Sequence, residues 1–219
     1  MNTFRWATTG LTKDLILSEG PAYVRGRTVR RILDVGSAAS EEIAELCPDA
    51  DEFIFLDSFV LPPARPRYTL LKQGAGDRFP VADASLDVVC TNGSFDHFTQ
   101  PERQNAFLEI ERCLRPGGLM LFACEYFDYD AQEEETFFAR FSANAAMQAI
   151  NCTASSNIDL RAIVNGLSAL RIRQDDLSVI PDGRPLRRFA GREEANYFRP
   201  HNDVVDATYG SFFVVFDRH

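Results

Sequence analysis

A histidine and an aspartate, His97 and Asp96, stand in a polar segment, residues 91–98, that directly follows a predicted buried strand. An imidazole has an unperturbed pKa of about 6.5, so His97 is suited to accept a proton near neutral pH. Asp96 could orient this imidazole through a hydrogen bond. The alternative is structural: His97 binds a backbone group near the next helix start, and Asp96 points away from it. The sequence identifies a candidate general base and leaves both interpretations open.

Three further residues could contact a small substrate. Glu125 and Tyr126 follow the predicted strand 119–123, where each could hold an amine or a hydroxyl group; a solvated loop is the alternative. His201 lies in a polar stretch, residues 181–209, that is predicted to be a long loop or flap. It could cover a binding site there or remain an exposed loop residue.

The best signal for a ligand site comes from two strand ends. Residues 29–36 form a short apolar run that ends in small residues, which predicts a buried strand followed by a tight turn at 37–40. Residues with little or no Cβ let a ligand approach the backbone of such a turn. Asp57 ends the next predicted strand, where its carboxylate can accept two hydrogen bonds from a ribose diol. In open parallel sheets, ligands bind at these carboxyl ends.

Strand and helix signals alternate along the chain, which predicts a largely parallel sheet with helices on both faces. Thr99 and Glu102 form a capping-box pattern at the start of a helix that ends before residues 115–118 (RPGG). Residues 128–170 are predicted to hold two helices, the second over 159–170. The predicted strands are residues 29–36, 53–56, 68–71, 86–90, 119–123, 177–180 and 211–216.

Charge and composition exclude several classes of partner. The net charge is -9 over 219 residues, which disfavours binding to a phosphate backbone, so no nucleic-acid substrate is expected. The apolar runs are strand-length and short of a membrane span, and no signal peptide is recognised. Five cysteines without a Cys-x-x-Cys pair favour reduced thiols in a cytoplasmic protein, with no metal site. We expect a monomer or homodimer with a small-molecule substrate.

Four motifs in this order resemble class I S-adenosylmethionine-dependent methyltransferases with the type-11 domain. They are residues 31–36 (RILDVG), Asp57, residues 79–89 (FPVADASLDVV) and residues 114–118 (LRPGG), all within about residues 29–124. The resemblance implies an α/β fold with a Rossmann-like, doubly wound, seven-stranded sheet, mostly parallel with an antiparallel C-terminal strand. It also implies one domain over 1–219, in which 29–124 bind the cofactor and 125–210 form a helical insertion and flap covering the substrate side.

The resemblance further implies S-adenosylmethionine as the cofactor and methyl transfer to an oxygen, nitrogen or carbon atom of a small molecule. Alignment is the main catalytic requirement for an in-line displacement from a sulfonium, and a base is needed only if the acceptor begins protonated. The implied cofactor-binding residues are Asp34, Gly36, Ser37, Asp57, Gly76, Asp77 and Asn92; the catalytic residues are His97 and Asp96; and the substrate-binding residues are Glu125, Tyr126 and His201.

Three residues in this pocket depart from the family pattern. Ala38 and Ser40 occupy two glycine positions of the usual Asp-x-Gly-x-Gly-x-Gly turn, and Ala75 occupies a position that is usually acidic and near adenine. A Cβ narrows the gap to the cofactor, and a positive φ in the turn would cost about 1 kcal/mol or more. Two alternatives to a methyltransferase therefore stay open. One is a methyltransferase fold recruited for cyclisation or rearrangement in natural-product biosynthesis, and the other is a catalytically silent binding subunit.

Overall fold

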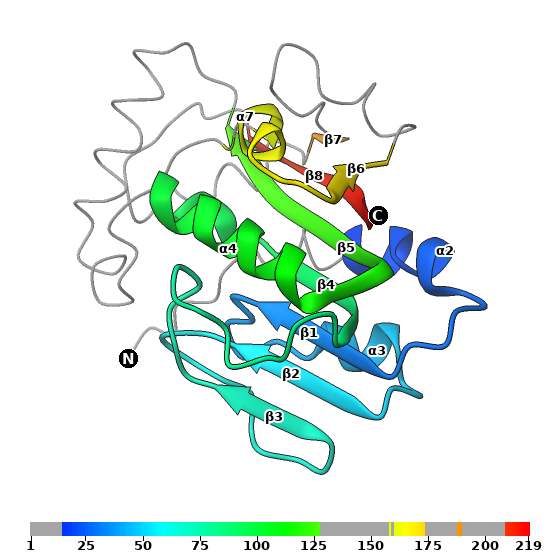
Figure 1. Cartoon of the computed structure of the whole chain (residues 1–219). Coiled ribbons are helices and arrows are strands. Elements are labelled where there is room, and N and C mark those ends of the chain that lie inside the picture. Colours follow the sequence, from blue (N-terminus) through cyan, green and yellow to red (C-terminus); the bar gives the residue numbers. More distant parts are fainter. Residues whose placement is uncertain (1–14, 128–157, 159, 174–187, 190–208) are drawn as a thin grey trace.

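The computed structural model describes residues 15–127, 158, 160–173, 188–189 and 209–219 (Figure 1). Residues 15–19 are helical, and strands and helices then alternate up to the middle of the chain. The elements in order are α2 (Pro21–Val24), β1 (Arg31–Val35), α3 (Glu42–Leu46), β2 (Glu52–Leu56), β3 (Tyr68–Leu71), β4 (Leu86–Asn92), the 3-10 turn η1 (Phe95–His97), α4 (Gln100–Cys113), β5 (Leu114–Phe127), α7 (Leu160–Asn165), β6 (Leu170–Ile172), β7 (Arg188–Phe189) and β8 (Tyr209–Arg218).

Seven strands form a continuous sheet in the order β3-β2-β1-β4-β5-β8-β6, and the two-residue β7 pairs with β8 beside this path. The first five strands of that order are mutually parallel. β8 runs antiparallel to both β5 and β6, so it lies inside the sheet. This confirms the predicted Rossmann-like sheet, including the antiparallel pairing of the late strand.

Successive strand residues alternate between two hydrophobic cores, one on each face of the sheet. In β1, Leu33 belongs to the core that includes Phe107 of α4 and Ile163 of α7. Ile32 belongs to the opposite core, together with Ile43 of α3. Helices therefore cover both faces, as a doubly wound sheet requires. Asp34 follows Ile32 by two positions and so faces the α3 side.

The start of α4 confirms the predicted capping box. Thr99 accepts a hydrogen bond from the backbone of Glu102, whose carboxylate in turn accepts from the backbone N–H of Thr99 at 2.7 Å. The end differs from the prediction, because β5 begins at Leu114, immediately after the helix. Pairing with β4 jumps from Leu86–Leu114 to Val88–Leu119, so residues 115–118 bulge from the strand instead of forming a separate loop.

The predicted second helix, residues 159–170, was wrong in part, and the predicted strand at residues 177–180 stays a prediction. Helix α7 ends at Asn165 and β6 is Leu170–Ile172, whereas residues 177–180 lie outside the described part of the chain. The cause is Glu111 of α4. Its carboxylate accepts hydrogen bonds from the backbone N–H groups of residues 168, 169 and 170, at 2.8–3.1 Å. These bonds hold a bend at residues 168–169 and the first residue of β6, where the sequence predicted helix.

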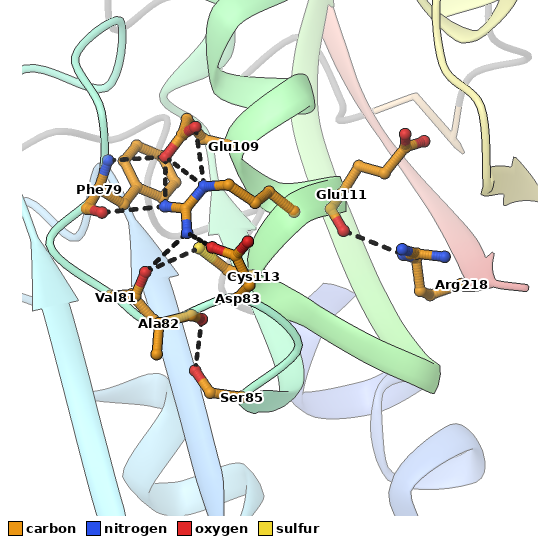
Figure 2. Close-up of polar contacts among 10 residues, drawn as sticks. Phe79, Val81, Ala82, Asp83, Ser85, Glu109, Glu111, Cys113 and Arg218 are labelled. Carbon is orange, nitrogen blue, oxygen red and sulfur yellow. Dashed lines mark hydrogen bonds and ion pairs between the residues drawn. The ribbon is translucent and has the colours of Figure 1, made fainter.

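The motif at residues 79–89 forms a clamp around Arg112 of α4. The guanidinium donates to the carbonyl oxygens of Phe79 at 3.0 Å and Val81 at 2.9 Å, and it pairs with Asp83 and Glu109. Glu109 also accepts from the Phe79 N–H, as the cluster in Figure 2 shows. The Arg112 hydrogen bonds lower the pKa of Glu109. This family-like motif therefore attaches a loop to a helix.

Asp87, near the end of the same motif, holds β4 to the start of β1. Its side chain is buried and accepts from the backbone N–H groups of Arg30 and Arg31 at 2.7 and 2.8 Å. Arg115 pairs with its other oxygen at 2.8 Å. Charge-assisted bonds of this kind fix the relative position of two central strands. Those strands carry the candidate site at their opposite ends.

Candidate cofactor-binding site

The candidate site lies where the strand order reverses. From β1 the chain proceeds outward to β2 and β3, then crosses back to β4 on the other side of β1. The carboxyl ends of β1 and β4 therefore meet at the switch point, the usual ligand position in such sheets. Asp34 and Asn92 lie at these two ends, and Asp57 directly follows β2. The fold thus brings together three of the predicted cofactor-binding residues.

Buried polar atoms mark this edge as a place for a polar ligand. Asp34, Ser37, Thr91 and Asn92 are each more than nine-tenths buried. Among the described residues, none forms a hydrogen bond with Asp34 Oδ1, Ser37 Oγ, Thr91 Oγ1 or Asn92 Oδ1. Buried polar groups almost always have a partner. Four such atoms on two adjoining strand ends therefore indicate a partner that comes from outside this part of the chain.

The Asp34 carboxyl lies in an unfavourable place for a charge. Burial raises its pKa well above the ordinary value, and the negative charges of Glu42 and Asp57 raise it further. Among the described residues, only the Ser40 hydroxyl acts in the opposite direction. A buried carboxyl of this type is stabilised by a cation or by a proton. The Asp34 carboxylate is therefore suited to bind a positively charged ligand group.

The turn after β1 requires glycine only at Gly36. Its φ is +77°, and a Cβ there would lie 2.4 Å from both Cβ and Oγ of Ser94. The Ser94 hydroxyl donates to the Val35 carbonyl oxygen at 3.0 Å, which holds the segment after β4 against the turn. Gly36 thus permits close contact between the two strand ends. Ser94 is a site residue that the sequence did not reveal.

The next two residues are strained. Ala38 and Ala39 have φ values of +45° and +65°, and the Ser40 N–H donates to the Ser37 carbonyl oxygen at 2.8 Å across them. Left-handed backbone costs a non-glycine residue about 1–2 kcal/mol. The predicted strain at Ala38 is therefore present. Ala39, and not Ser40, adopts the second positive φ of the turn.

Asp57 stabilises this strained turn. One carboxylate oxygen accepts from the Ala38 N–H at 2.9 Å, and the other accepts from the N–H groups of Phe59 and Val60 at 2.7 and 3.0 Å. A carboxylate offers about four lone-pair sites. Three are used, and the fourth remains on the oxygen bound by Ala38. Asp57 can therefore offer a ribose one hydrogen bond without rearrangement, whereas two were predicted.

The loop after β3 brings Gly76 and Asp77 to the same end of the sheet. A Cβ on Gly76 would lie 2.8 Å from the Glu102 side chain, so glycine here lets the loop pack on the start of α4. The Asp77 N–H closes a turn by donating to the Gly74 carbonyl oxygen at 3.2 Å. Ala75, at the usual acidic position, is buried. Asp77 is therefore the acidic side chain of this loop.

The candidate base is held by backbone contacts of η1. The His97 N–H donates to the Ser94 carbonyl oxygen at 3.1 Å, and the side chain is half-buried. Arg103 of α4, only 1% exposed, donates from Nε to the Phe95 carbonyl oxygen at 2.7 Å. These bonds fix the backbone position that carries the His97 side chain. The side chain of Asp96 lies outside the described part, so its predicted role beside His97 stays a prediction.

For two of the predicted substrate-binding residues, Glu125 and Tyr126, the structure describes the backbone position only. Glu125 and Tyr126 belong to β5, where they pair with Ser211 and Gly210 of β8, and their side chains are not described. This differs from the alternative of a solvated loop after the strand, because β5 continues to residue 127. His201 lies outside the described residues.

Sequence reasoning missed Glu42, Thr91, Ser94 and Arg103 at this edge. Glu42 had a signal of its own, because an acidic residue in a first helical turn suits a helix N-terminus. That signal gives no hint that Glu42 is buried, at 4% exposure. An arginine on a helix is usually solvated, so nothing in the sequence distinguishes Arg103.

Other kinds of site are not found in the described part of the chain. No group of three His, Cys, Asp or Glu side chains there could hold a metal ion. The four described cysteines are all buried and reduced. No described helix has the length and apolarity needed to cross a membrane. The switch-point edge is therefore the candidate functional site.

The strand order, the antiparallel β8 and the polar switch-point edge together define the class I S-adenosylmethionine-dependent methyltransferase fold. Residues 33–122 match the family model described as a methyltransferase domain, so this segment carries the type-11 methyltransferase domain that the motifs indicated. No curated protein matches the sequence.

Solved structures, two of them named as methyltransferases, share the fold at low sequence identity. The YcgJ protein from Bacillus subtilis is 12% identical, with a TM-score of 0.62 over 93% of this chain and 97% of that chain. Geranyl diphosphate methyltransferase, solved in complex with S-adenosylmethionine, is 12% identical, with a TM-score of 0.55 over 92% of this chain and 85% of that one. N-methyltransferase NodS from Bradyrhizobium japonicum WM9, solved with S-adenosylhomocysteine, is 14% identical, with a TM-score of 0.53 over 94% of this chain and 84% of that chain.

Proposed function

We propose that the protein is an S-adenosylmethionine-dependent methyltransferase that acts on a small-molecule acceptor. The observation that carries this proposal is the set of buried polar atoms at the ends of β1 and β4 for which the described residues supply no partner. Asp34 Oδ1 and Asn92 Oδ1 are acceptors, which suits the ammonium group of the methionyl part of the cofactor. Ser37 adds a hydroxyl. These residues fit the group, and Asp57 would hold the ribose.

When bound, the cofactor would supply an electrophilic methyl group on its sulfonium. The chain's own contribution would be to align the acceptor with that methyl group and to exclude water. His97 would accept the proton of an acceptor that begins protonated. Ser94 and Arg103 would keep η1, and hence His97, in a fixed position through their bonds to its backbone.

The net charge of -9 and the small-molecule substrate named for one structural neighbour, geranyl diphosphate methyltransferase, support a small-molecule acceptor. We further propose that the protein is cytoplasmic, functions as a monomer or homodimer, and binds neither nucleic acid nor membrane. The division into a cofactor-binding half, 29–124, and a covering segment, 125–210, is part of the same proposal.

One observation favours the two competing functions. Ala38, which has a positive φ, and Ser40 stand at two of the family's glycine positions, and the buried Ala75 stands where the family has an acid. A fold recruited for a non-methylating cyclisation or rearrangement, or a silent binding subunit, would tolerate such a pocket. Both alternatives predict that the protein lacks methyl transfer even where the adenosyl ligand binds.

Calorimetric titration of the purified protein with S-adenosylmethionine and S-adenosylhomocysteine tests the proposal. We expect micromolar binding by the wild type and by Asp51→Ala, which lies exposed just before β2. Asp57→Ala, after the carboxyl end of β2, should bind more weakly. If neither ligand binds to the wild type, the methyltransferase proposal is wrong. If both bind but a panel of oxygen, nitrogen and carbon acceptors yields no S-adenosylhomocysteine, a recruited or silent function is favoured.

A further inference from the structure

The residue that follows the turn after β1 is bound to the edge strand β3. Glu41 comes directly after the turn at 37–40 and stands at the start of α3. Its carboxylate accepts a hydrogen bond from the Tyr68 hydroxyl at 2.8 Å and pairs with Arg65 at 3.0 Å. Tyr68 is the first residue of β3, which β2 separates from β1. The turn at the switch point is therefore attached to a strand that is not adjacent to it in the sheet.

The Tyr68 side chain is held in place to make this bond. The centroid of its ring lies 4.8 Å from that of Phe55 and 5.6 Å from that of Phe53, and both phenylalanines are buried. Burial raises the pKa of Tyr68, and the hydrogen bond to Glu41 raises it further, so the hydroxyl keeps its proton and remains a donor. A hydrogen bond to a carboxylate is stronger than one between neutral groups. The bond between Tyr68 and Glu41 is therefore a firm attachment.

Arg65 contributes less to this attachment than Tyr68 does. The Arg65 side chain is 55% exposed and that of Glu41 is 25% exposed, and ion pairs in such positions add little to stability. The Glu41 side chain also makes no capping hydrogen bond to α3. Its contacts are directed to β3 and its preceding loop instead of to its own helix. The hydroxyl of Tyr68 is therefore the main partner of Glu41.

The attachment acts on a turn that stores strain. Ala38 and Ala39 have positive φ values, and the Ala38 N–H donates to the Asp57 carboxylate at 2.9 Å. Strained backbone of this kind persists only where the surrounding contacts over-determine it. Asp57 fixes the first strained residue, and the side chain of Glu41 fixes the residue that follows the turn. The strained turn is thus held at both ends, by contacts from two different strand ends.

Building on the proposed cofactor site, we propose that Glu41 and Tyr68 are positioning residues for the cofactor, which keep the turn at 37–40 in the conformation that the adenosyl ligand binds. Both act through the backbone of the turn and not by touching the ligand. A ligand that binds one conformation loses affinity in proportion to the fraction of the protein that leaves it. Glycines at positions 38 and 39 would adopt the same conformation without strain, so the attachment compensates for the two alanines.

Calorimetric titration with S-adenosylhomocysteine compares Tyr68→Phe, which removes only the hydroxyl, with Thr69→Val as a matched control. The Thr69 hydroxyl donates to the Glu52 carboxylate at 2.6 Å, so the control loses a bond of the same kind from the next position of β3. Glu52 begins β2, at the opposite end of that strand from the turn. We expect about fivefold weaker binding by Tyr68→Phe and wild-type affinity for Thr69→Val. Thermal unfolding verifies that each variant is folded.

A second comparison tests whether the hydroxyl acts through the strained turn. In a protein that also carries Ala38→Gly and Ala39→Gly, Tyr68→Phe should weaken binding by less than about twofold, because the glycines remove the strain. In the ligand-free protein with both alanines, Tyr68→Phe should speed amide hydrogen exchange at Ser40, whose N–H donates to the Ser37 carbonyl oxygen at 2.8 Å. Thr69→Val should leave exchange at Ser40 unchanged.

The outcomes separate this inference from the proposed function. Wild-type affinity in a folded Tyr68→Phe protein overturns the positioning role, while the methyltransferase proposal stands. The same holds if Thr69→Val loses as much affinity as Tyr68→Phe, or if Tyr68→Phe costs as much affinity with glycines as with alanines in the turn. If the wild type does not bind the ligand, both proposals are wrong.

Discussion

Replacing both left-handed alanines by glycine, Ala38→Gly with Ala39→Gly, should stabilise the protein. Their φ values of +45° and +65° cost a Cβ-bearing residue about 1–2 kcal/mol each, so the double change relieves about 2–4 kcal/mol. Each glycine also gains freedom in the unfolded chain, which opposes the gain by about 0.4–1 kcal/mol. The net expectation is an increase of about 1–2 kcal/mol in the free energy of unfolding. For a chain of this length that corresponds to a Tm rise of about 2–8 °C.

Urea unfolding and calorimetry measure this change against two single controls. Ala84→Gly has a φ of +49° far from the site, so it should stabilise the protein about half as much and leave S-adenosylhomocysteine affinity unchanged. Ala44→Gly lies within α3 and should destabilise it by about 0.5–1 kcal/mol. If the double variant behaves like Ala44→Gly, the turn is not strained and the reasoning is refuted. Tighter ligand binding by the double variant would show that the alanine Cβ atoms obstruct the cofactor.

Three further changes test other parts of the structure. Asp57→Ala should weaken S-adenosylhomocysteine binding by about tenfold and also lower the Tm, because three backbone N–H groups lose their acceptor; equal affinity in calorimetry would place the ligand elsewhere. Arg112→Met should lower the free energy of unfolding in urea by about 2–3 kcal/mol, since Glu109 loses its cation, whereas an unchanged midpoint would show that the clamp is dispensable. Asp34→Asn should raise stability at pH 7. The raised pKa of Asp34 means that the folded state holds a proton more tightly than the unfolded state, so its contribution is lost as pH rises above about 4, and the variant should show a flatter pH dependence of Tm between pH 4 and 7.

The fold was largely predictable because its signals are local. The capping box at Thr99 and Glu102, the strand-length apolar runs and the small turn after β1 each depend on neighbouring residues. Strand β6, Leu170–Ile172, was not predictable in this way. Its position depends on bonds between Glu111 and residues 168–170, which are 57–59 positions apart in the sequence. No local pattern carries that information.

Site residues were predictable where a polar residue stands at the end of a predicted strand. They were not predictable where the role of a residue depends on its burial in the folded protein. Asp34 and Asn92 follow from the strand positions together with the family resemblance. Glu42 resembles any acidic residue at a helix start, and only the packing of α3 against β1 shows that it is buried. Which residue of the turn adopts the second positive φ, Ala39 and not Ser40, depends on the backbone conformation of the turn, and side-chain types do not specify it.

The insertion of β8 between β5 and β6 has a consequence for how the molecule is made. Within the described sheet, β6 reaches the other strands through β8 alone, and β8 follows all of them in sequence. Until residues 209–218 have been synthesised, the growing chain has an open edge on β5 and a detached β6. Exposed strand edges pair readily with other chains. The nascent protein is therefore most vulnerable to aggregation just before translation reaches this segment, and a truncation that removes it should leave a product that is prone to aggregate and degrade.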